Sequence, residues 1–201
     1  MELKRLNKEE LSTLYREEMI YDFPKSELKS LGTMHRMMDR GLYEPLTAVE
    51  DGETLGYAMM WLAEEPDSAL LDYLGVLRGK RDRGLGGRLL GLLQGRYRQL
   101  FGEAENPDSE NRKENDLRRR RLGFYERNGF RITDYQCALF GVRFNNIYFG
   151  PETDDRRVEA AHRAIYARWF SPEHMERYIQ LPLLPGEAVR PAPAWVEEEE
   201  E

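Results

Sequence analysis

The sequence predicts an α+β fold, in which helices flank a mixed sheet. Three patterns predict it: helical periodicity in two early segments, a hairpin signal at Asp51-Gly52, and one strand–helix–strand crossover across residues 69–105. A further helix and a closing hairpin follow the crossover. With 201 residues, the chain is long enough for one sizeable core and short for two full enzyme domains.

The first half opens with a short strand at residues 2–6, and Asn7 with Glu10 then resembles a capping box. Apolar residues recur at helical spacing over residues 11–19 and again over residues 28–38. Residues 46–49 and 54–62 are the two arms of the predicted hairpin, because Asp-Gly favours a tight turn between strands. Residues 69–77 have the pattern of a buried strand.

The second half begins with a predicted helix over residues 84–100 and a short strand over residues 100–105. A charged helix is expected from residue 112 to residue 127, where Asn128-Gly129 forms a good C-cap pair. Residues 130–140 and 142–149 are typical of two closing strands. These elements place the main domain at residues 1–150.

After Gly150 the composition changes. Thr153 is expected to cap a helix whose apolar stripe continues to Trp169, and Ser171 starts a shorter helix with proline in its first turn. We therefore divide the remainder into a helical extension, residues 151–180, and a Pro-rich acidic tail, residues 181–201, expected to be flexible. The stripe must be buried, either on the main domain or in a homodimer contact.

Composition excludes several classes of protein. There are 30 Lys and Arg against 37 Asp and Glu, a net charge of −7, which disfavours a general nucleic-acid binder. No apolar run reaches the ~18–20 residues that span a membrane, and the N-terminus lacks an apolar signal core. Cys137 is the one cysteine of the sequence, so we expect no internal disulfide. The three histidines lack metal-ligand spacing, so we expect no metal site. We expect a cytoplasmic protein. His162 is interpreted as a packing residue on an apolar helix face.

The most informative stretch is a basic turn that joins the strand at residues 69–77 to the next helix; residues 77–88 are called the glycine-rich turn below. The first N–H groups of a helix have no partner inside it, and with the helix dipole they form an anion site. Gly84, Gly86 and Gly87 leave the backbone open to a phosphate, and Arg81, Arg83 and Arg88 can add charge. The alternative is a glycine-rich helix start that binds nothing.

Two other phosphate motifs fit less well. The turn has no Gly-Lys-Ser or Gly-Lys-Thr ending, and Leu89 stands where the dinucleotide fingerprint needs a third glycine. By contrast, Arg81-x-x-Gly84-x-Gly86 resembles the acyl-CoA signature of the GCN5-related N-acetyltransferases (GNAT). The segment Phe124-Tyr125-Glu126-Arg127-Asn128-Gly129-Phe130 resembles the Phe-Tyr-x-x-x-Gly-Phe segment of that family, in the family's order.

The resemblance covers about residues 2–150 and implies a mostly antiparallel central sheet flanked by helices, with a splayed parallel strand pair. Acetyl-CoA would be the co-substrate, with its diphosphate on the glycine-rich turn and its pantetheine arm along the strand before it. The residues that the resemblance assigns to coenzyme A are Leu74, Val76, Leu77, Arg81, Arg83, Gly84, Leu85, Gly86, Gly87, Arg88 and Arg118.

In this family a neutral amine attacks the acetyl thioester directly. The resemblance implies that the backbone N–H near Val76 serves the oxyanion and that Tyr125 is a general acid beside the sulfur. Glu103 and Glu105 alternate on the strand after the crossover helix and are the candidate bases. Asp72 and Tyr73 are reserve candidates, although a buried Asp72 would need a partner.

One position departs from the family pattern. Many members have asparagine seven residues before the tyrosine, where this chain has Arg118. Arg118 could meet a cofactor phosphate or pair with Glu114 and Asp116, and Arg119–Arg121 are expected to form a solvated charged face.

The leading functional prediction is an N-acetyltransferase that acts on a small primary amine. The alternative is a non-catalytic acyl-CoA-binding or sensor protein of the same fold, which would need neither Tyr125 nor an acidic base. A third reading, nucleic-acid binding through Arg118–Arg121, conflicts with the net charge.

Overall fold

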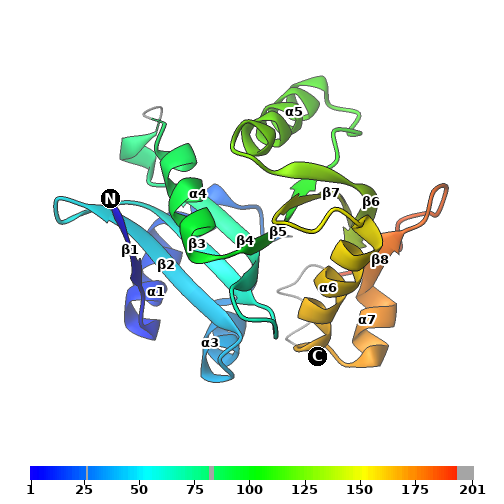
Figure 1. Ribbon diagram of the computed structural model, residues 1–201, viewed down its shortest axis with the longest axis horizontal. Coiled ribbons are helices and arrows are strands. Elements are labelled where there is room, and N and C mark those ends of the chain that lie inside the picture. Colours follow the sequence, from blue (N-terminus) through cyan, green and yellow to red (C-terminus); the bar gives the residue numbers. More distant parts are fainter. Residues whose placement is uncertain (26, 82–83, 194–201) are drawn as a thin grey trace. The chain divides into compact units, whose positions relative to one another are not determined.

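The computed structural model describes residues 1–25, 27–81 and 84–193, which form two compact units. Unit 1 contains Met1–Leu62 and Leu71–Arg96, and unit 2 contains Ala63–Leu70 and Tyr97–Ala192. Each unit has its own strands and helices, labelled in Figure 1, and each is described by itself. Arg83 and the acidic run at residues 197–201 lie outside the described residues.

Unit 1 has four strands in the order β1-β2-β3-β4. They are β1 (Glu2–Arg5), β2 (Tyr43–Glu50), β3 (Glu53–Leu62) and β4 (Ser68–Val76), and the first residues of β4, up to Leu70, belong to unit 2. Its helices are α1 (Lys8–Leu14), which continues through a π-helical turn (Tyr15–Met19) into α2 (Ile20–Asp22), then α3 (Leu31–Asp39) and α4 (Leu85–Arg96).

The β2–β3 hairpin is confirmed. The two strands are antiparallel, with Tyr43 opposite Trp61 and Glu50 opposite Glu53. Asp51 and Gly52 at the tip have φ of 52° and 80°, the left-handed conformations that a tight hairpin turn requires. Asp and Gly tolerate this region better than other residues, which explains why the sequence signal was reliable.

Periodic apolar residues build the core of unit 1. Asn7 and Glu10 form the predicted capping box at the start of α1. Leu11, Met19, Met34 and Met37 are fully buried, as expected for residues on the inner face of amphipathic helices.

Unit 2 has strands β5 (Gln99–Glu105), β6 (Arg131–Leu139), β7 (Val142–Phe149) and β8 (Ile179–Leu183). Their order is β5-β7-β6-β8, and every neighbouring pair is antiparallel. Helices α5 (Arg112–Arg127), α6 (Asp155–Ala167) and α7 (Pro172–Tyr178) accompany them, and Figure 1 shows α5 and α6 on opposite sides of the strands.

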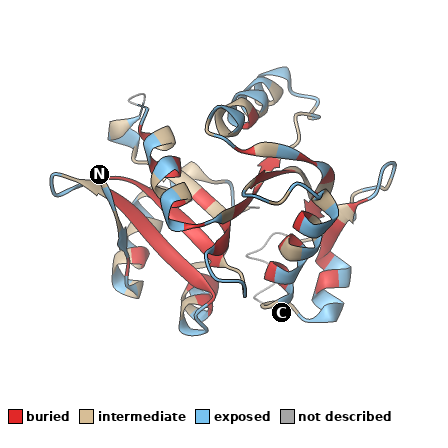
Figure 2. Ribbon diagram, viewed as in Figure 1, coloured by how far each residue is buried: buried red, intermediate tan, exposed pale blue. Residues whose placement is uncertain are grey.

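Helix α6 begins one residue later than predicted, because the Asp154 side chain, rather than Thr153, accepts the first capping bond, from the N–H of Arg156. Its stripe of Val158, His162, Ile165 and Tyr166 is buried within unit 2 (Figure 2). The extension therefore packs on strands of its own unit, while the homodimer contact stays a prediction.

The tail differs from the expectation over its first residues. Residues 181–183 complete β8, which pairs with β6, and Ile179, Leu181 and Leu183 are buried there. Residues 194–201, where flexibility was expected, lie outside the described residues.

The predicted fold class, an α+β arrangement of a mostly antiparallel sheet with flanking helices, is confirmed. The splayed pair of the prediction corresponds to β4 and β5, and its splay stays a prediction. None of the helices described has both the length and the apolar character needed to cross a membrane.

Candidate active site

The glycine-rich turn of unit 1 follows β4 through a short 3₁₀ turn (Arg78–Lys80) and leads into α4. Gly84 stands immediately before the helix with φ of 67°, a conformation that L-residues rarely adopt. The N–H of Arg88 donates to the carbonyl of Gly84 at 3.2 Å, which closes the first turn of the helix. The amides of Leu85, Gly86 and Gly87 therefore precede the helical ladder.

This arrangement fits a diphosphate. A Cβ added at Gly84 would meet no atom of the described residues within 4 Å, so they leave the space beside this backbone open. First-turn amides and the helix dipole both favour an anion there. The sequence prediction of a backbone cradle at residues 84–87 therefore has a structural basis in α4.

The arginines of the turn already have carboxylate partners in unit 1. Arg81 donates to Asp22 at 2.5 Å and also to the Val76 carbonyl at 3.3 Å, and Arg88 pairs with Glu50. Half of each arginine side chain remains exposed. These pairs fix the turn against α2 and β2 and moderate its positive charge.

The strand residues predicted to accompany the pantetheine arm, Leu74, Val76 and Leu77, are half-buried. The Leu77 N–H donates to the Leu55 carbonyl at 3.0 Å, so β4 stays joined to β3 up to the start of the turn. This hydrogen bond fixes the position at which the glycine-rich turn begins.

The two reserve candidates on β4 have structural partners. Asp72 accepts from the Lys29 ammonium at 2.6 Å and from the Tyr43 hydroxyl at 2.5 Å, and both Lys29 and Asp72 are nearly buried. Burial, followed by the Asp72 charge, raises the pKa of Tyr43 well above its usual range. The Tyr73 hydroxyl donates to the Glu27 carbonyl. The expectation that a buried Asp72 has a partner is confirmed.

In unit 2, Glu103 belongs to a set of residues called the Glu103 cluster here: Glu103, Tyr135, His162 and Tyr166. Oε1 of Glu103 accepts from His162 Nε2 at 2.9 Å and from the Tyr166 hydroxyl at 2.5 Å. His162 Nδ1 lies 3.2 Å from the Tyr135 hydroxyl. No described residue donates a hydrogen bond to Oε2. The exposed fraction of the Glu103 side chain is 12%. One carboxylate oxygen is held and the other is available.

Glu105 has different partners. Its Oε1 pairs with Arg118 at 2.9 Å and its Oε2 with Arg121 at 2.6 Å, so a guanidinium of α5 occupies each oxygen. The two glutamates that sequence reasoning could not separate are therefore distinguished by their surroundings.

Arg118 is half-buried and contacts several acceptors in unit 2. It pairs with Glu105 and with Glu114, and donates to the Asn106 carbonyl at 2.8 Å. Of the two pairs considered from the sequence, the one with Glu114 forms, whereas Asp116 pairs with Arg119. A role for Arg118 at a cofactor phosphate stays a prediction.

Tyr125 lies at the end of α5, where its ring contacts Phe124 and Phe130 at centroid distances of 5.3 and 5.5 Å. Burial raises the pKa of Tyr125 to about 12. The phenol therefore keeps its proton at neutral pH. Within the described part of the chain, nothing hydrogen-bonds its hydroxyl, and it makes no hydrogen bond with Glu103 or Glu105.

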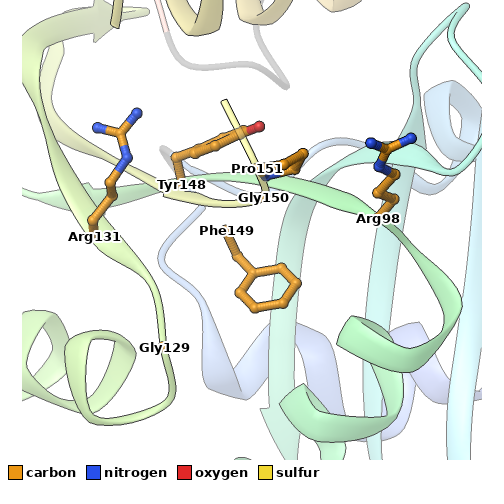
Figure 3. Close-up of a pocket in the computed structure, with 7 residues that line it drawn as sticks. All are labelled: Arg98, Gly129, Arg131, Tyr148, Phe149, Gly150 and Pro151. Carbon is orange, nitrogen blue, oxygen red and sulfur yellow. The ribbon is translucent and has the colours of Figure 1, made fainter. Parts of the chain in front are cut away.

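A separate pocket of about 300 Å³ lies where α5 and β7 end and β6 begins, and Figure 3 shows its lining. The lining residues are Arg98, Gly129, Arg131, Tyr148, Phe149, Gly150 and Pro151. Arg131 stacks on Tyr148 and pairs with Asp155 of α6. None of the site residues predicted from the sequence lines this pocket.

Sequence reasoning missed His162 and Tyr166 as partners of a candidate base. His162 is buried, as its apolar helix face predicted, but both of its ring nitrogens are hydrogen-bonded. The spacing of residues 162 and 166 indicates one face of α6, yet nothing local identifies Glu103, 59 positions before His162, as the group they face. Among the described residues no group of His, Cys, Asp and Glu side chains could hold a metal ion.

Comparison with known proteins agrees with the turn and the fold. Residues 43–132 match the model of the acetyltransferase (GNAT) domain. A Bacteroides thetaiotaomicron structure assigned to the GNAT acetyltransferases is 19% identical, with a TM-score of 0.67, covering 89% of this chain and 98% of that one. No curated protein matches the chain at a significant level.

Two further solved structures share the fold. The aminoglycoside acetyltransferase AAC(6')-Ib, in complex with coenzyme A and kanamycin, is 17% identical, with a TM-score of 0.54 over 77% of this chain and 97% of that one. The ribosomal-protein-alanine N-acetyltransferase from Brucella melitensis is 15% identical, with a TM-score of 0.51 over 75% of this chain and all of that one. At these identities the likeness establishes the fold.

The matched domain defines the class of protein: the chain is an acyl-CoA-dependent acetyltransferase. More particularly, it carries a GNAT acetyltransferase domain, with acetyl-CoA as the co-substrate, and the resemblance seen at Arg81-x-x-Gly84-x-Gly86 is confirmed.

Proposed function

We propose that this protein transfers an acetyl group from acetyl-CoA to a primary amine of a small molecule, by direct attack of the amine, with Glu103 as the general base. The observation that carries the proposal is Oε2 of Glu103, which accepts no hydrogen bond from any residue that the structure describes, on a carboxylate whose other oxygen is fixed by two donors. The similar aminoglycoside acetyltransferase, complexed with kanamycin, supports a small-molecule acceptor.

The coenzyme would be held at the glycine-rich turn, and it supplies the activated acetyl group. The amides of residues 85–87 would bind its diphosphate, and the open backbone at Gly84 admits the phosphate oxygens. The N–H of Val76 is the proposed donor to the oxyanion. Arg81 and Arg88 contribute positive charge while paired with Asp22 and Glu50.

Glu103 is a better candidate base than Glu105, because the described residues leave its Oε2 able to accept a proton. The amine must lose a proton to become nucleophilic, and Oε2 of Glu103 can take that proton directly or through one water. Glu105 has both oxygens engaged by guanidinium groups, so an incoming ammonium would have to displace an arginine.

Tyr125 is the proposed donor to the leaving sulfur. With a pKa of about 12, its hydroxyl is protonated at neutral pH and can donate a hydrogen bond to a developing thiolate. Its place in the Phe124–Phe130 segment, which resembles the family motif, supports this role.

Thiol release from acetyl-CoA, measured with a panel of amines, tests the proposal. The panel should include a polyamine, an aminoglycoside, an aryl-alkylamine and an amino acid. The wild type is expected to turn over at least one amine, and E103Q to lose about 10²- to 10⁴-fold in kcat. E105Q should retain more activity than E103Q.

Calorimetry with coenzyme A provides the control, because E103Q should bind it as the wild type does. Tight binding of coenzyme A without turnover of any amine would overturn the proposal and favour the non-catalytic sensor. Activity lost in E105Q and kept in E103Q would transfer the role of base to Glu105.

A further inference from the structure

Helix α6 lies outside the residues that match the GNAT domain model, yet it supplies two of the four residues in the Glu103 cluster. Both residues are buried: the exposed fraction is 0% for His162 and 1% for Tyr166. Polar groups are costly to bury without partners. His162 Nε2 and the Tyr166 hydroxyl share one acceptor, Oε1 of Glu103.

The direction of each bond follows from the chemistry of the groups. An ionised carboxylate can only accept, so His162 Nε2 and the Tyr166 hydroxyl donate to Glu103. In a neutral imidazole, Nδ1 then accepts, and the Tyr135 hydroxyl at 3.2 Å is the donor. Burial raises the pKa of Tyr135 well above its usual range, so this phenol keeps its proton. A continuous chain runs from Tyr135 through His162 to Glu103.

The remaining neighbours add no positive charge. Cys137 on β6 is buried, and burial, followed by the Glu103 charge, raises its pKa so that it stays a thiol. Asn146 on β7 stands opposite Glu103 in the sheet and accepts from Cys137. Among the described residues, Glu103 pairs with no lysine or arginine. A cationic amine would therefore be the first positive charge to reach this carboxylate.

The pattern of bonds is one-sided. A purely structural carboxylate inside a protein is expected to have both oxygens satisfied, as Glu105 has. In Glu103, two donors converge on Oε1, and no donor among residues 1–25, 27–81 and 84–193 reaches Oε2. Such an arrangement fixes the orientation of the carboxylate while leaving one lone-pair face available.

We infer that His162 and Tyr166 are positioning residues, through which α6 holds Glu103 in the orientation that accepts the proton of the acceptor amine, while Tyr135 fixes the His162 tautomer. The inference rests on the proposed function, since it gives Glu103 the role of base. In the reaction the N–H bond of the amine breaks and an O–H bond forms at Oε2. His162 and Tyr166 keep their own protons throughout.

Three variants and a matched control test the inference in the full-length protein. Y166F and H162L each remove one donor to Oε1, and H162Q restores an N–H donor in place of the imidazole. Y148F is the control, because Tyr148 is also a buried tyrosine of unit 2, and its hydroxyl donates to Gln99 at 2.7 Å, away from Glu103. Melting curves and coenzyme A calorimetry show that each variant is folded.

Y166F and H162L should each lower kcat about 10- to 100-fold, because a misplaced catalytic group loses this much, with little change in KM for acetyl-CoA. The pH profile of kcat/KM should change together with kcat in both variants, whereas a loss of packing alone would leave the profile unchanged. H162Q should recover part of kcat, and Y148F should match the wild type in kcat and pH profile.

The outcomes separate the inference from the function on which it rests. If E103Q is inactive while Y166F and H162L keep wild-type kcat and pH profile, the positioning role is wrong and the base stands. Equal loss in Y148F would show a general packing effect and overturn the inference. An active E103Q removes both the base and its positioning residues, and a wild type without turnover overturns the proposed function as well.

Discussion

The carboxylates that pair with the glycine-rich turn are held differently from the carboxylate of the Glu103 cluster. At the turn, Glu50 and Asp22 accept from guanidinium groups that stay about half exposed. In the cluster, Glu103 accepts from a buried imidazole and a buried phenol, neither of which needs to carry a charge. The turn lies at the surface of unit 1, and the cluster lies inside unit 2.

The difference follows from the cost of removing charge from water. An exposed ion pair stays hydrated and screened, so it positions a loop at little cost and contributes little stability. A guanidinium in the core would have to be desolvated together with the carboxylate. Neutral donors fix a buried carboxylate without a second ion, and they leave its charge for a cationic substrate.

The largest expected effect comes from the buried ion pair of Lys29 and Asp72 in unit 1. K29M should destabilise the protein by about 3–5 kcal/mol, because it leaves a buried carboxylate without its ammonium. K29M/D72N should be less destabilised than the sum of its two single variants. Chemical denaturation measures all three, and a loss in K29M no larger than that of an exposed pair would break the comparison.

An intermediate effect is expected at Gly84. G84V should weaken coenzyme A binding about tenfold or more, because a φ of 67° costs an L-residue ~1–2 kcal/mol and the first helical turn would relax away from it. Calorimetry measures the affinity. The control is G91A within α4, where a new Cβ meets no atom within 4 Å.

G91A should stabilise the protein by about 0.5–1 kcal/mol, since alanine is the better helix former, and leave the affinity for coenzyme A unchanged. Unaltered binding in G84V would remove the backbone cradle from the proposed site.

The smallest effect is expected for R88Q, which removes the main partner of Glu50. Arg88, followed by the N-terminal ammonium, lowers the pKa of Glu50 from 4.5 to about 2. A lowered carboxyl pKa contributes stability above pH 4.5, and this contribution disappears as the pH falls towards 2. The melting temperature of R88Q should be slightly below that of the wild type at pH 7. The difference should become smaller in high salt, and it should vanish near pH 2.

A large melting shift in R88Q at pH 7 that persists in high salt would contradict this expectation. It would show that the turn depends on its charges as the cluster depends on its hydrogen bonds.

The sequence by itself determined the local features. The Asp51-Gly52 hairpin, the Asn7 capping box and the span of α5 each depend on residues a few positions apart. The glycine-rich turn is of the same kind, because its cradle is made of consecutive backbone amides and one left-handed glycine. A site made of consecutive backbone amides can therefore be predicted from a short stretch of sequence.

Only the tertiary structure decided the surroundings of the two glutamates. Alternation predicts Glu103 and Glu105 on one strand face, yet in the structure Glu103 contacts α6 and Glu105 contacts α5, two helices on opposite sides of the strands. His162 and Tyr166 lie 59 and 63 positions from Glu103. Their meeting depends on the strand order β5-β7-β6 and on the packing of α6, and no sequence period encodes a side-chain contact over that distance.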